Sequence, residues 1–189
     1  YDTSVAGYDL THALAINTIY QVPLGKGKRF STGSRVADYI LGQWQLNNIF
    51  TASSGFPFYP TVTGDQANTG NGRTYEHANL VGNPHLDHPT PAQWFNIAAY
   101  ATPAKYTYGN APRNSLRTQA YWNIDTSLFR LFPVGDGRAF EFRAEAFNIS
   151  NHPVLGTPVV NVTSAGTFGT INTTSSTARQ LQLAIKFRF

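Results

Sequence analysis

The stretch of the sequence most suggestive of chemistry is "EHANLVGNPHLDH" at residues 76–88, which holds three histidines and two acids. Its tightest group is His85, Asp87 and His88. Imidazole and carboxylate side chains in such a group are typical ligands of zinc or copper. The spacing does not place them on one helical face, and loops bounded by Pro and Gly often collect polar side chains. We therefore expect a polar loop here and no metal site.

Two glycine-rich stretches also resemble binding loops without matching their spacing. In "GDQANTGNG" (64–72), Asp65, Asn68 and Asn71 lie three residues apart, whereas a calcium loop of the EF-hand type places its ligands two apart. We predict a polar turn there. "GKGKR" at 25–29 lacks the spacing of a phosphate loop, so we interpret it as a positively charged interfacial turn that contacts lipid head groups.

Catalytic chemistry finds little support in the sequence. The chain contains no Cys, which excludes a thiolate nucleophile and a cysteine metal site. No Ser–His–Asp arrangement or carboxylate pair can be defended, so we expect no catalytic residue, no cofactor and no enzymatic activity. The net charge of +4 is modest and mostly spread out, which argues against nucleic-acid binding. The Asn-x-Ser/Thr triplets at Asn148, Asn161 and Asn172 are interpreted only as polar loops.

The elements that must carry these residues are β-strands. Aromatic residues make up 14% of the chain and charged residues only 13%, a balance that favours an all-β protein. Apolar and polar residues alternate in runs of about 10–12 residues, the length that a tilted strand needs to cross a bilayer. Strands of water-soluble proteins average about 5–6 residues. The predicted strands are 11–22, 43–53, 121–132, 138–149 and 178–189.

The connections between these strands favour an antiparallel outer-membrane β-barrel. A tight turn, "PVGDG" at 133–137, joins the third and fourth strands, whereas the second and third, and the fourth and fifth, are joined by long segments rich in Gly, Pro, Asn and Thr. Outer-membrane barrels have short periplasmic turns and long external loops. With the C-terminus in the periplasm, the short turn lies in the periplasm and both long loops lie outside.

The strand faces agree with this topology. Aromatic side chains end the strands at the periplasmic side, as an interfacial girdle requires. They are Tyr20, Trp44, Phe132, Phe140, Phe187 and Phe189, with Trp122 at the outer side. Arg130 shares the lipid-facing parity, and we expect it to extend to interfacial water.

The opposite parity of the third and fourth strands carries charges that we expect to face the lumen. They are Asp125, Glu141, Arg143 and Glu145. Asp125 should lie within cross-strand or diagonal reach of Arg143 or Glu145. These charges either neutralise one another in a wet interior, or contact a plug domain and line a solute path.

Five strands cannot close a barrel, since the smallest barrels have about 8. We therefore predict that residues 1–189 are the C-terminal segment of a barrel domain, whose other strands lie upstream or on another copy of the chain. Two unpaired sheet edges indicate that such a segment is not a stable monomer by itself. The alternative that uses the same apolar faces is a soluble carbohydrate-binding β-sandwich with aromatic side chains stacked on sugars.

Several motifs follow one another in an order that resembles a known family. They are "GQWQLNNIFTASSGFPF" (42–58), "GDQANTGNG" (64–72), "HANLVGNPHLDHPTPAQWFNIAAYATP" (77–103), "YGNAPRNSLR" (108–117), "NIDTSLFRLFPV" (123–134) and "FEFRAEAFNISNHPVLGTP" (140–158). Together with the ending "RQLQLAIKFRF", they resemble the C-terminal barrel region of Oar-like TonB-dependent outer-membrane receptors of the acidobacterial type. The resemblance covers almost the whole chain.

This resemblance implies a bacterial outer-membrane receptor with a carboxypeptidase-regulatory-like domain, a plug domain and a barrel of about 22 strands. The implied activity is uptake of an unidentified ligand, energised through TonB by way of a plug segment. The long loops would contact the ligand through Trp94, Tyr100, Tyr106 and Tyr108. A passive porin-like or adhesin-like barrel is the alternative.

The same resemblance gives the last strand a second role. Leu183, Ile185, Phe187 and Phe189 alternate and end on an aromatic residue, which fits the signal that the barrel-assembly machinery recognises. An exposed strand edge with alternating side chains is suited to recognition by β-augmentation. The expected partners are thus the assembly machinery, membrane lipid, TonB and the ligand.

Overall fold

The computed structural model describes residues 3–31, 33–70 and 75–189, and these divide into two compact units. One unit, here called the sheet unit, consists of Ala13–Ala52, Trp122–His152 and Thr177–Phe189. The other, here called the loop unit, consists of Tyr1–His12, Ser53–Tyr121 and Pro153–Ser176. Each is described by itself.

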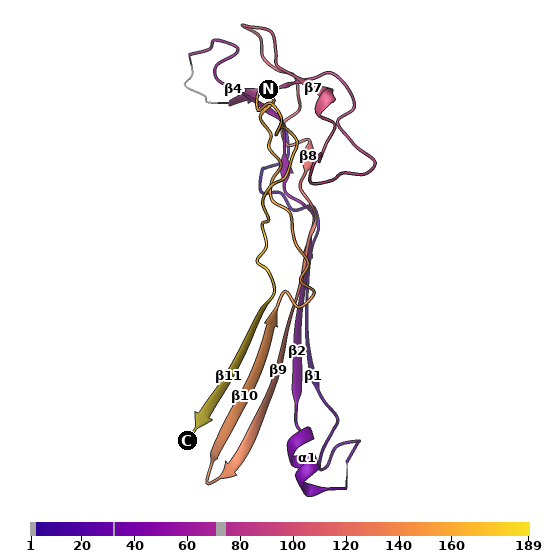
Figure 1. Ribbon diagram of the computed structural model, residues 1–189, viewed down its shortest axis with the longest axis vertical. Helices are drawn as coiled ribbons and strands as arrows, with labels where there is room; N and C mark the ends of the chain where they lie inside the picture. Colours follow the sequence, from indigo (N-terminus) through magenta and orange to yellow (C-terminus); the bar gives the residue numbers. More distant parts are fainter. Residues whose placement is uncertain (1–2, 32, 71–74) are drawn as a thin grey trace. The chain divides into compact units, whose positions relative to one another are not determined.

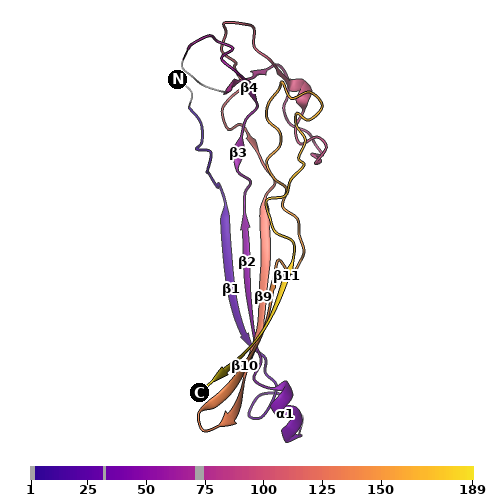
Figure 2. The same cartoon turned by 60° about the vertical axis from the view of Figure 1, so that its left-hand side comes forward.

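The sheet unit contains one five-stranded sheet with the order β1-β2-β9-β10-β11 (Figure 1). Its strands are β1 (Ala13–Gln21), β2 (Gln45–Ser53), β9 (Tyr121–Gly135), β10 (Arg138–Phe147) and β11 (Gln180–Arg188). Figure 2 shows β1, β2 and β9 side by side. All five predicted strands are confirmed, and β10 pairs antiparallel with both β9 and β11. The sheet is open, with β1 and β11 at its edges.

The turn between β9 and β10 is tighter than the predicted five residues. Asp136 and Gly137 form its centre with φ angles of 52° and 76°. Two consecutive residues with positive φ form the type I′ turn that Asp-Gly sequences favour in hairpins. β9 therefore continues to Gly135, and the pairing shifts register between Arg138 and Ala139.

The register separates two faces of the sheet. In β10 and β11 the apolar side chains pair directly, as in Phe140 with Phe187, Phe142 with Ile185 and Ala144 with Leu183. We call this side the apolar face. The other side, here the polar face, pairs Glu141 with Lys186 and Glu145 with Gln182. Because side chains alternate along a strand, this pairing fixes the orientation of every residue in both strands.

The apolar face also contains a polar ladder that the alternation did not reveal. Asn48 of β2 donates from Nδ2 to Thr18 Oγ1 of β1 at 3.4 Å and accepts at Oδ1 from Thr126 Oγ1 of β9 at 2.9 Å. Each of the three polar groups thereby has a partner on a neighbouring strand. This pairing lowers the free-energy cost of placing them on an apolar surface.

The segment between β1 and β2 contains a helix that we did not predict, α1 (Arg35–Leu41). Ser34 is its N-cap and accepts from the backbone N–H of Ala37. At the other end, Gly42 lies against Gly25, where a Cβ would come within 2.9 Å of the Gly25 Cα. Seven residues are too few for a helix that is stable alone, so α1 depends on tertiary contacts.

Arg130 of β9 contacts the C-terminal end of α1. Its guanidinium donates to the carbonyl oxygens of Tyr39 and Ile40, which are among the last carbonyls of the helix and lack helical partners. Only 2% of Arg130 is exposed. We predicted that this side chain extends to interfacial water, and that is wrong, because α1 covers it and satisfies its charge with backbone oxygens.

The loop unit is folded around its own hydrophobic core, a feature that the prediction of long external loops did not include. Its core consists of Phe58, Val62, Ala78, Phe95, Ala99, Tyr100, Ala111 and Leu116. Short antiparallel pairs surround it: β3 (Pro57–Phe58) with β8 (Leu116–Arg117), β4 (Thr61–Thr63) with β5 (Tyr75–His77), and β6 (Asn79–Leu80) with β7 (Tyr100–Ala101). A 3₁₀ turn, η1 (Ile97–Ala99), precedes β7. The core residues are scattered in sequence, so no periodic pattern of apolar residues predicted them.

The two long connections pack together inside this unit. The backbone N–H of Thr61 donates to Val160 O at 2.8 Å, and Val162 N–H donates to Thr61 O at 2.9 Å. Ile171 N–H donates to Pro91 O at 2.7 Å. Backbone bonds of this kind satisfy groups that would otherwise be buried without partners. Residues 153–176 are therefore an integral part of the unit.

Candidate functional site

Charged side chains on the polar face form a cluster between β10 and β11. Arg143 Nη2 lies 2.8 Å from Glu141 Oε1, and Arg143 Nη1 lies 3.7 Å from Glu145 Oε1. Arg188 of β11 donates to the second carboxylate oxygen of Glu141. Glu141 is only 4% exposed, so its charge is held between two guanidinium groups. The cluster can orient or screen a polar solute, but its carboxylates are already paired with guanidinium groups.

Asp125 lies near this cluster but bonds elsewhere. Because Ser127 pairs with Glu145, Asp125 occupies the diagonal position that we expected. Its Oδ1 accepts instead from the backbone N–H of Asn148 and from Asn123 Nδ2, both at 2.8 Å. Asp125 therefore fixes the turn after β10 and forms no ion pair with Arg143.

Asn148 is a structural residue that the sequence did not identify. We interpreted its Asn-x-Ser triplet as a polar loop, yet Asn148 is 7% exposed with φ of 48°. Its Nδ2 donates to the carbonyls of His152 and Thr177, at 3.2 and 3.0 Å, and its Oδ1 accepts from His152 N–H at 3.0 Å. The Trp122 ring stacks on His152 at 4.2 Å. Asn148 thus ties the end of β10 to the segment leading into β11.

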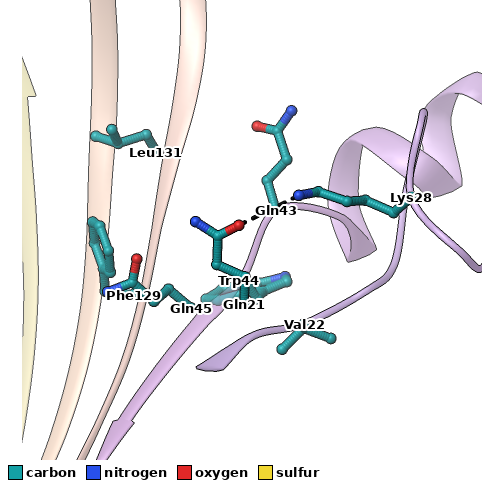
Figure 3. Close-up of a pocket in the computed structure, with 8 residues that line it drawn as sticks. All are labelled: Gln21, Val22, Lys28, Gln43, Trp44, Gln45, Phe129 and Leu131. Atoms are coloured by element: carbon teal, nitrogen blue, oxygen red, sulfur yellow. Dashed lines mark hydrogen bonds between the residues drawn. The ribbon is translucent and has the colours of Figure 1, made fainter. Parts of the chain in front are cut away.

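A small cavity opens at one end of the polar face (Figure 3). Its volume is about 280 Å³, and three glutamines contribute to its lining together with Lys28, whose Nζ lies 3.4 Å from Gln21 Oε1. The lining residues are Gln21, Val22, Lys28, Gln43, Trp44, Gln45, Phe129 and Leu131. Amide side chains offer both donors and acceptors.

Polar contacts continue along the same face from this cavity. Gln45 Nε2 donates to Asn47 Oδ1 at 2.8 Å, and Asn47 Nδ2 donates to Ser127 Oγ at 3.3 Å. The arrangement suits hydrogen bonding to an uncharged polar solute.

The histidines of residues 76–88 do not gather into one site. His77 has its Nδ1 2.8 Å from the carbonyl of Ala111 and its ring 4.7 Å from that of Tyr59. His85, Asp87 and His88 are exposed. Over residues 3–31, 33–70 and 75–189, no group of three or more acidic, His or Cys side chains could hold a metal ion.

The polar turn at Asp65 has the predicted conformation over the residues that the structure describes. Asp65 Oδ1 accepts from Thr69 N–H at 2.8 Å, and Oδ2 accepts from Gly70 N–H at 2.7 Å. The Thr69 amide, followed by that of Gly70, lowers the pKa of Asp65 below its ordinary value. Asn71 lies outside the described residues.

A second cavity, of about 380 Å³, lies in the loop unit and is here called the loop pocket. It combines aromatic and aliphatic walls with His85 and Arg117. Its lining consists of Pro84, His85, Leu86, Pro89, Trp94, Phe95, Ser115, Leu116 and Arg117. Arg117 is anchored by Asp9, whose Oδ2 lies 2.7 Å from Nη2, and this bond lowers the pKa of Asp9. A few polar groups in a mostly apolar cavity are typical of small-molecule sites.

The four aromatic residues predicted to contact a ligand fall into different environments. Tyr100 is buried in the core, and burial raises the pKa of its phenol above its usual value. Its contact with ligand stays a prediction, which this burial disfavours. Trp94 lines the loop pocket and donates from Nε1 to the carbonyl of Arg117 at 2.9 Å. Tyr106 and Tyr108 are each 73% exposed.

Comparison with known families now gives these features a context. The family described as outer membrane beta barrel domain matches residues 1–182 of the chain. The chain belongs to this family. It is therefore an outer-membrane protein of a bacterium, and the soluble β-sandwich alternative is wrong. Comparisons with curated proteins and with solved structures gave no match.

Membership of the outer-membrane barrel family explains why the sheet exposes so much apolar surface. Leu181, Leu183 and Ile185 are each about three-quarters exposed, with relative areas of 74–75%. In an outer-membrane barrel these side chains face lipid. Among the described residues, no helix is long and apolar enough to cross a membrane.

Aromatic rings of the barrel gather where β9 and β10 turn, as the predicted girdle requires. Trp44 lies 6.1 Å from Phe132, and Phe140 lies 5.0 Å from Phe187, measured between ring centroids. Phe189 is fully exposed and its ring lies 6.2 Å from that of Phe187. The assembly role of Leu183, Ile185, Phe187 and Phe189 stays a prediction.

Proposed function

We propose that this outer-membrane barrel domain is the barrel portion of a TonB-dependent receptor that captures a ligand in its external loops and takes it up. The observation that carries the proposal is the loop unit. Here the long connections between the strands of the sheet fold around a core and enclose a pocket. Folding long external segments into a compact unit costs conformational entropy, and recognition of a ligand is a reason for a protein to bear that cost. Its resemblance to Oar-like receptors supports the energised form of uptake.

Ligand capture is assigned to the loop pocket. Trp94 offers an aromatic face, Arg117 a cation held in place by Asp9, and His85 an exposed imidazole. Since the pocket holds about 380 Å³, it fits a small molecule or one terminal group of a larger ligand. The residues proposed for recognition bind and orient a ligand, so the proposal includes no enzymatic step.

Passage of the solute is assigned to the polar face. Amide side chains of β1 and β2 and the paired charges of β10 give this face many donors and acceptors without a strong net charge. A hydrated polar face whose charges neutralise one another lets a polar solute move along it, because the face does not bind the solute tightly. TonB would act through a plug domain of the kind found in the receptors that this chain resembles.

Dependence on TonB is the direct test of this function. Cells that produce the full-length protein should lose uptake when TonB is removed, while binding to the cell surface is retained. A Trp94→Ala variant should lose both binding and uptake, whereas Tyr75→Ala, an exposed aromatic of the loop unit outside the pocket, serves as a matched control. Uptake that continues unchanged without TonB would contradict the receptor and favour a passive porin.

The passive porin is retained as a second function because of the cavity and polar contacts on the polar face. A porin would admit many small polar solutes at rates proportional to their concentration. Single-channel conductance of the purified full-length protein separates the two, since a plugged receptor conducts poorly.

Recognition by the barrel-assembly machinery is proposed for β11. Its outer edge has no partner strand among the described residues, and its side chains alternate up to Phe189. Deletion of Phe189 should lower the amount of full-length protein in the outer membrane. Replacement of Lys186 by Gln, on the other face of the same strand, is the control. Equal membrane levels of the deletion and wild type would overturn this role.

A further inference from the structure

The connection between β1 and β2 combines exposed apolar side chains with basic ones, a pairing that belongs at a membrane surface. In α1, Val36 is 69%, Ile40 is 53% and Leu41 is 48% exposed. Phe30, in the segment leading to the helix, is 54% exposed. Lys26, Lys28, Arg29 and Arg35 lie in the same connection. Short amphipathic helices with this composition lie in the plane of a bilayer interface.

Contacts at its C-terminal end place α1 on the apolar face. Arg130, which bonds to the carbonyls of Tyr39 and Ile40, lies on the parity of Leu128 and Phe142. Tyr39 Oη donates to Pro133 O at 2.9 Å, and Trp44 Nε1 donates to Ile40 O at 3.1 Å. Three side chains thus fix the helix at the end of β9, where the lipid-facing band of the strand stops.

Aromatic rings surround the Arg130 guanidinium on this face. Its carbon lies 4.2 Å from the Phe132 centroid and 5.8 Å from the Trp44 centroid. Such cation–π contacts stabilise a cation that has left water. Among the described residues, the Nε of Arg130 is buried and has no hydrogen-bond partner.

A cavity of about 590 Å³ lies beside Arg130 and is bounded by the β1–β2 connection. Three basic side chains, Lys26, Arg35 and Arg130, line it, against one carboxylate, Asp38. Asp38 accepts from Ser31 Oγ at 2.7 Å. Within the described residues, Lys26 and Arg35 form no ion pair. The cavity therefore carries an excess of positive charge next to apolar side chains.

We propose that this cavity binds the head group of a glycerophospholipid, with its phosphate on Lys26 and Arg35. Val36, Ile40 and Leu41 would then contact the acyl chains. The phosphate is the part of a lipid that basic residues recognise through charge-assisted hydrogen bonds. Free phosphate would use the same cations but leave the apolar side chains of α1 in water, which is why a lipid is the better fit. The proposal is independent of TonB and of the transported ligand.

Lipid binding to the purified full-length protein tests this proposal. The protein is extracted from the outer membrane in a mild detergent, and its affinity for added phosphatidylglycerol is measured by native mass spectrometry. A basic residue at an anionic surface contributes about 1 kcal/mol, or about fivefold in affinity. Lys26→Gln combined with Arg35→Gln should therefore weaken binding about 25-fold.

Matched controls distinguish the lipid site from general charge effects. Lys105→Gln combined with Arg113→Gln removes the same charge from exposed positions of the loop unit and should leave affinity unchanged. Both double variants replace exposed side chains, and the melting temperature of each verifies that it is folded.

Three results would overturn the proposal. One is equal affinity of both double variants. The second is an affinity for inorganic phosphate equal to that for phosphatidylglycerol, which would show a site for the free anion. The third is an affinity for diacylglycerol equal to that for phosphatidylglycerol, which would show a purely apolar groove.

Discussion

The two units of this outer-membrane protein place their apolar residues in opposite ways. In the loop unit, Val62 is 1% and Phe95 2% exposed, whereas in the sheet unit Leu183 is 74% exposed and Arg130 only 2%. The loop unit buries hydrophobic side chains, whereas the sheet unit exposes them and buries a charged one. The difference shows that the chain is built for two solvents, because apolar surface is stable when exposed to lipid and costly when exposed to water.

The largest expected effect comes from removing the centre of the loop core. Phe95 contacts the rings of Phe58, Tyr100 and Phe168 at 5.2–5.8 Å between centroids. Phe95→Ala should lower the free energy of unfolding of the loop unit by about 3–5 kcal/mol. Hydrogen exchange should show faster exchange in the loop unit while β9 and β10 stay protected. Equal loosening of both units would contradict their separate stability.

Charge placed on the lipid-facing side should have the next largest effect. Leu183→Arg, near the middle of β11, should cost about 2–4 kcal/mol of folding free energy in lipid vesicles. Gln182→Arg introduces the same side chain on the polar face and should cost far less. Unfolding of the full-length protein in urea measures both. If the two variants are equally destabilised, the faces are assigned wrongly.

A third variant tests how the end of β10 is held to the segment that leads into β11. Asn148→Ala removes the four hydrogen bonds that this buried side chain forms with His152, Thr177 and Ser150, and leaves the partner groups without them. Leaving buried groups unsatisfied costs about 1–3 kcal/mol each. We expect a loss of about 2 kcal/mol and faster exchange at the start of β11. Asn172→Ala, at an exposed asparagine, should change little.

These contrasts also explain what the sequence predicted and what it did not. Alternation in β1, β2, β9, β10 and β11 reflects a local rule, that neighbouring side chains of a strand face opposite sides, so all five strands could be found. The Asp136–Gly137 turn follows from backbone preferences of two residues. Both signals are contained within a few consecutive positions.

The remaining features depend on contacts between distant residues. α1 is short, and it exists because Arg130, far along the chain, satisfies its last carbonyls. Tyr100 and Tyr106 look equivalent in sequence, yet one is in the core and the other is 73% exposed, because only three-dimensional packing separates them. The role of Asn148 was hidden for the same reason, since its partners include Thr177.

The smallest expected effect is a dependence of the loop unit on pH. The amides of Thr69 and Gly70 lower the pKa of Asp65 in the folded state. A lowered pKa stabilises the fold above the unfolded value of about 3.9, and this stabilisation is lost as the pH falls through the folded pKa. Asp65→Asn should flatten the stability of the loop unit between about pH 5 and pH 2. An unchanged pH profile in the variant would show that Asp65 contributes nothing.

The central claim is that alternate residues of β11 face lipid and water, and fluorescence can measure this directly. Since the chain contains no Cys, single variants such as Leu183→Cys and Gln182→Cys each present one thiol for an environment-sensitive dye. The full-length protein is placed in vesicles whose acyl chains carry bromine, which quenches dyes in contact with the hydrocarbon. We predict strong quenching at position 183 and little at position 182. Equal quenching at both positions would contradict the account.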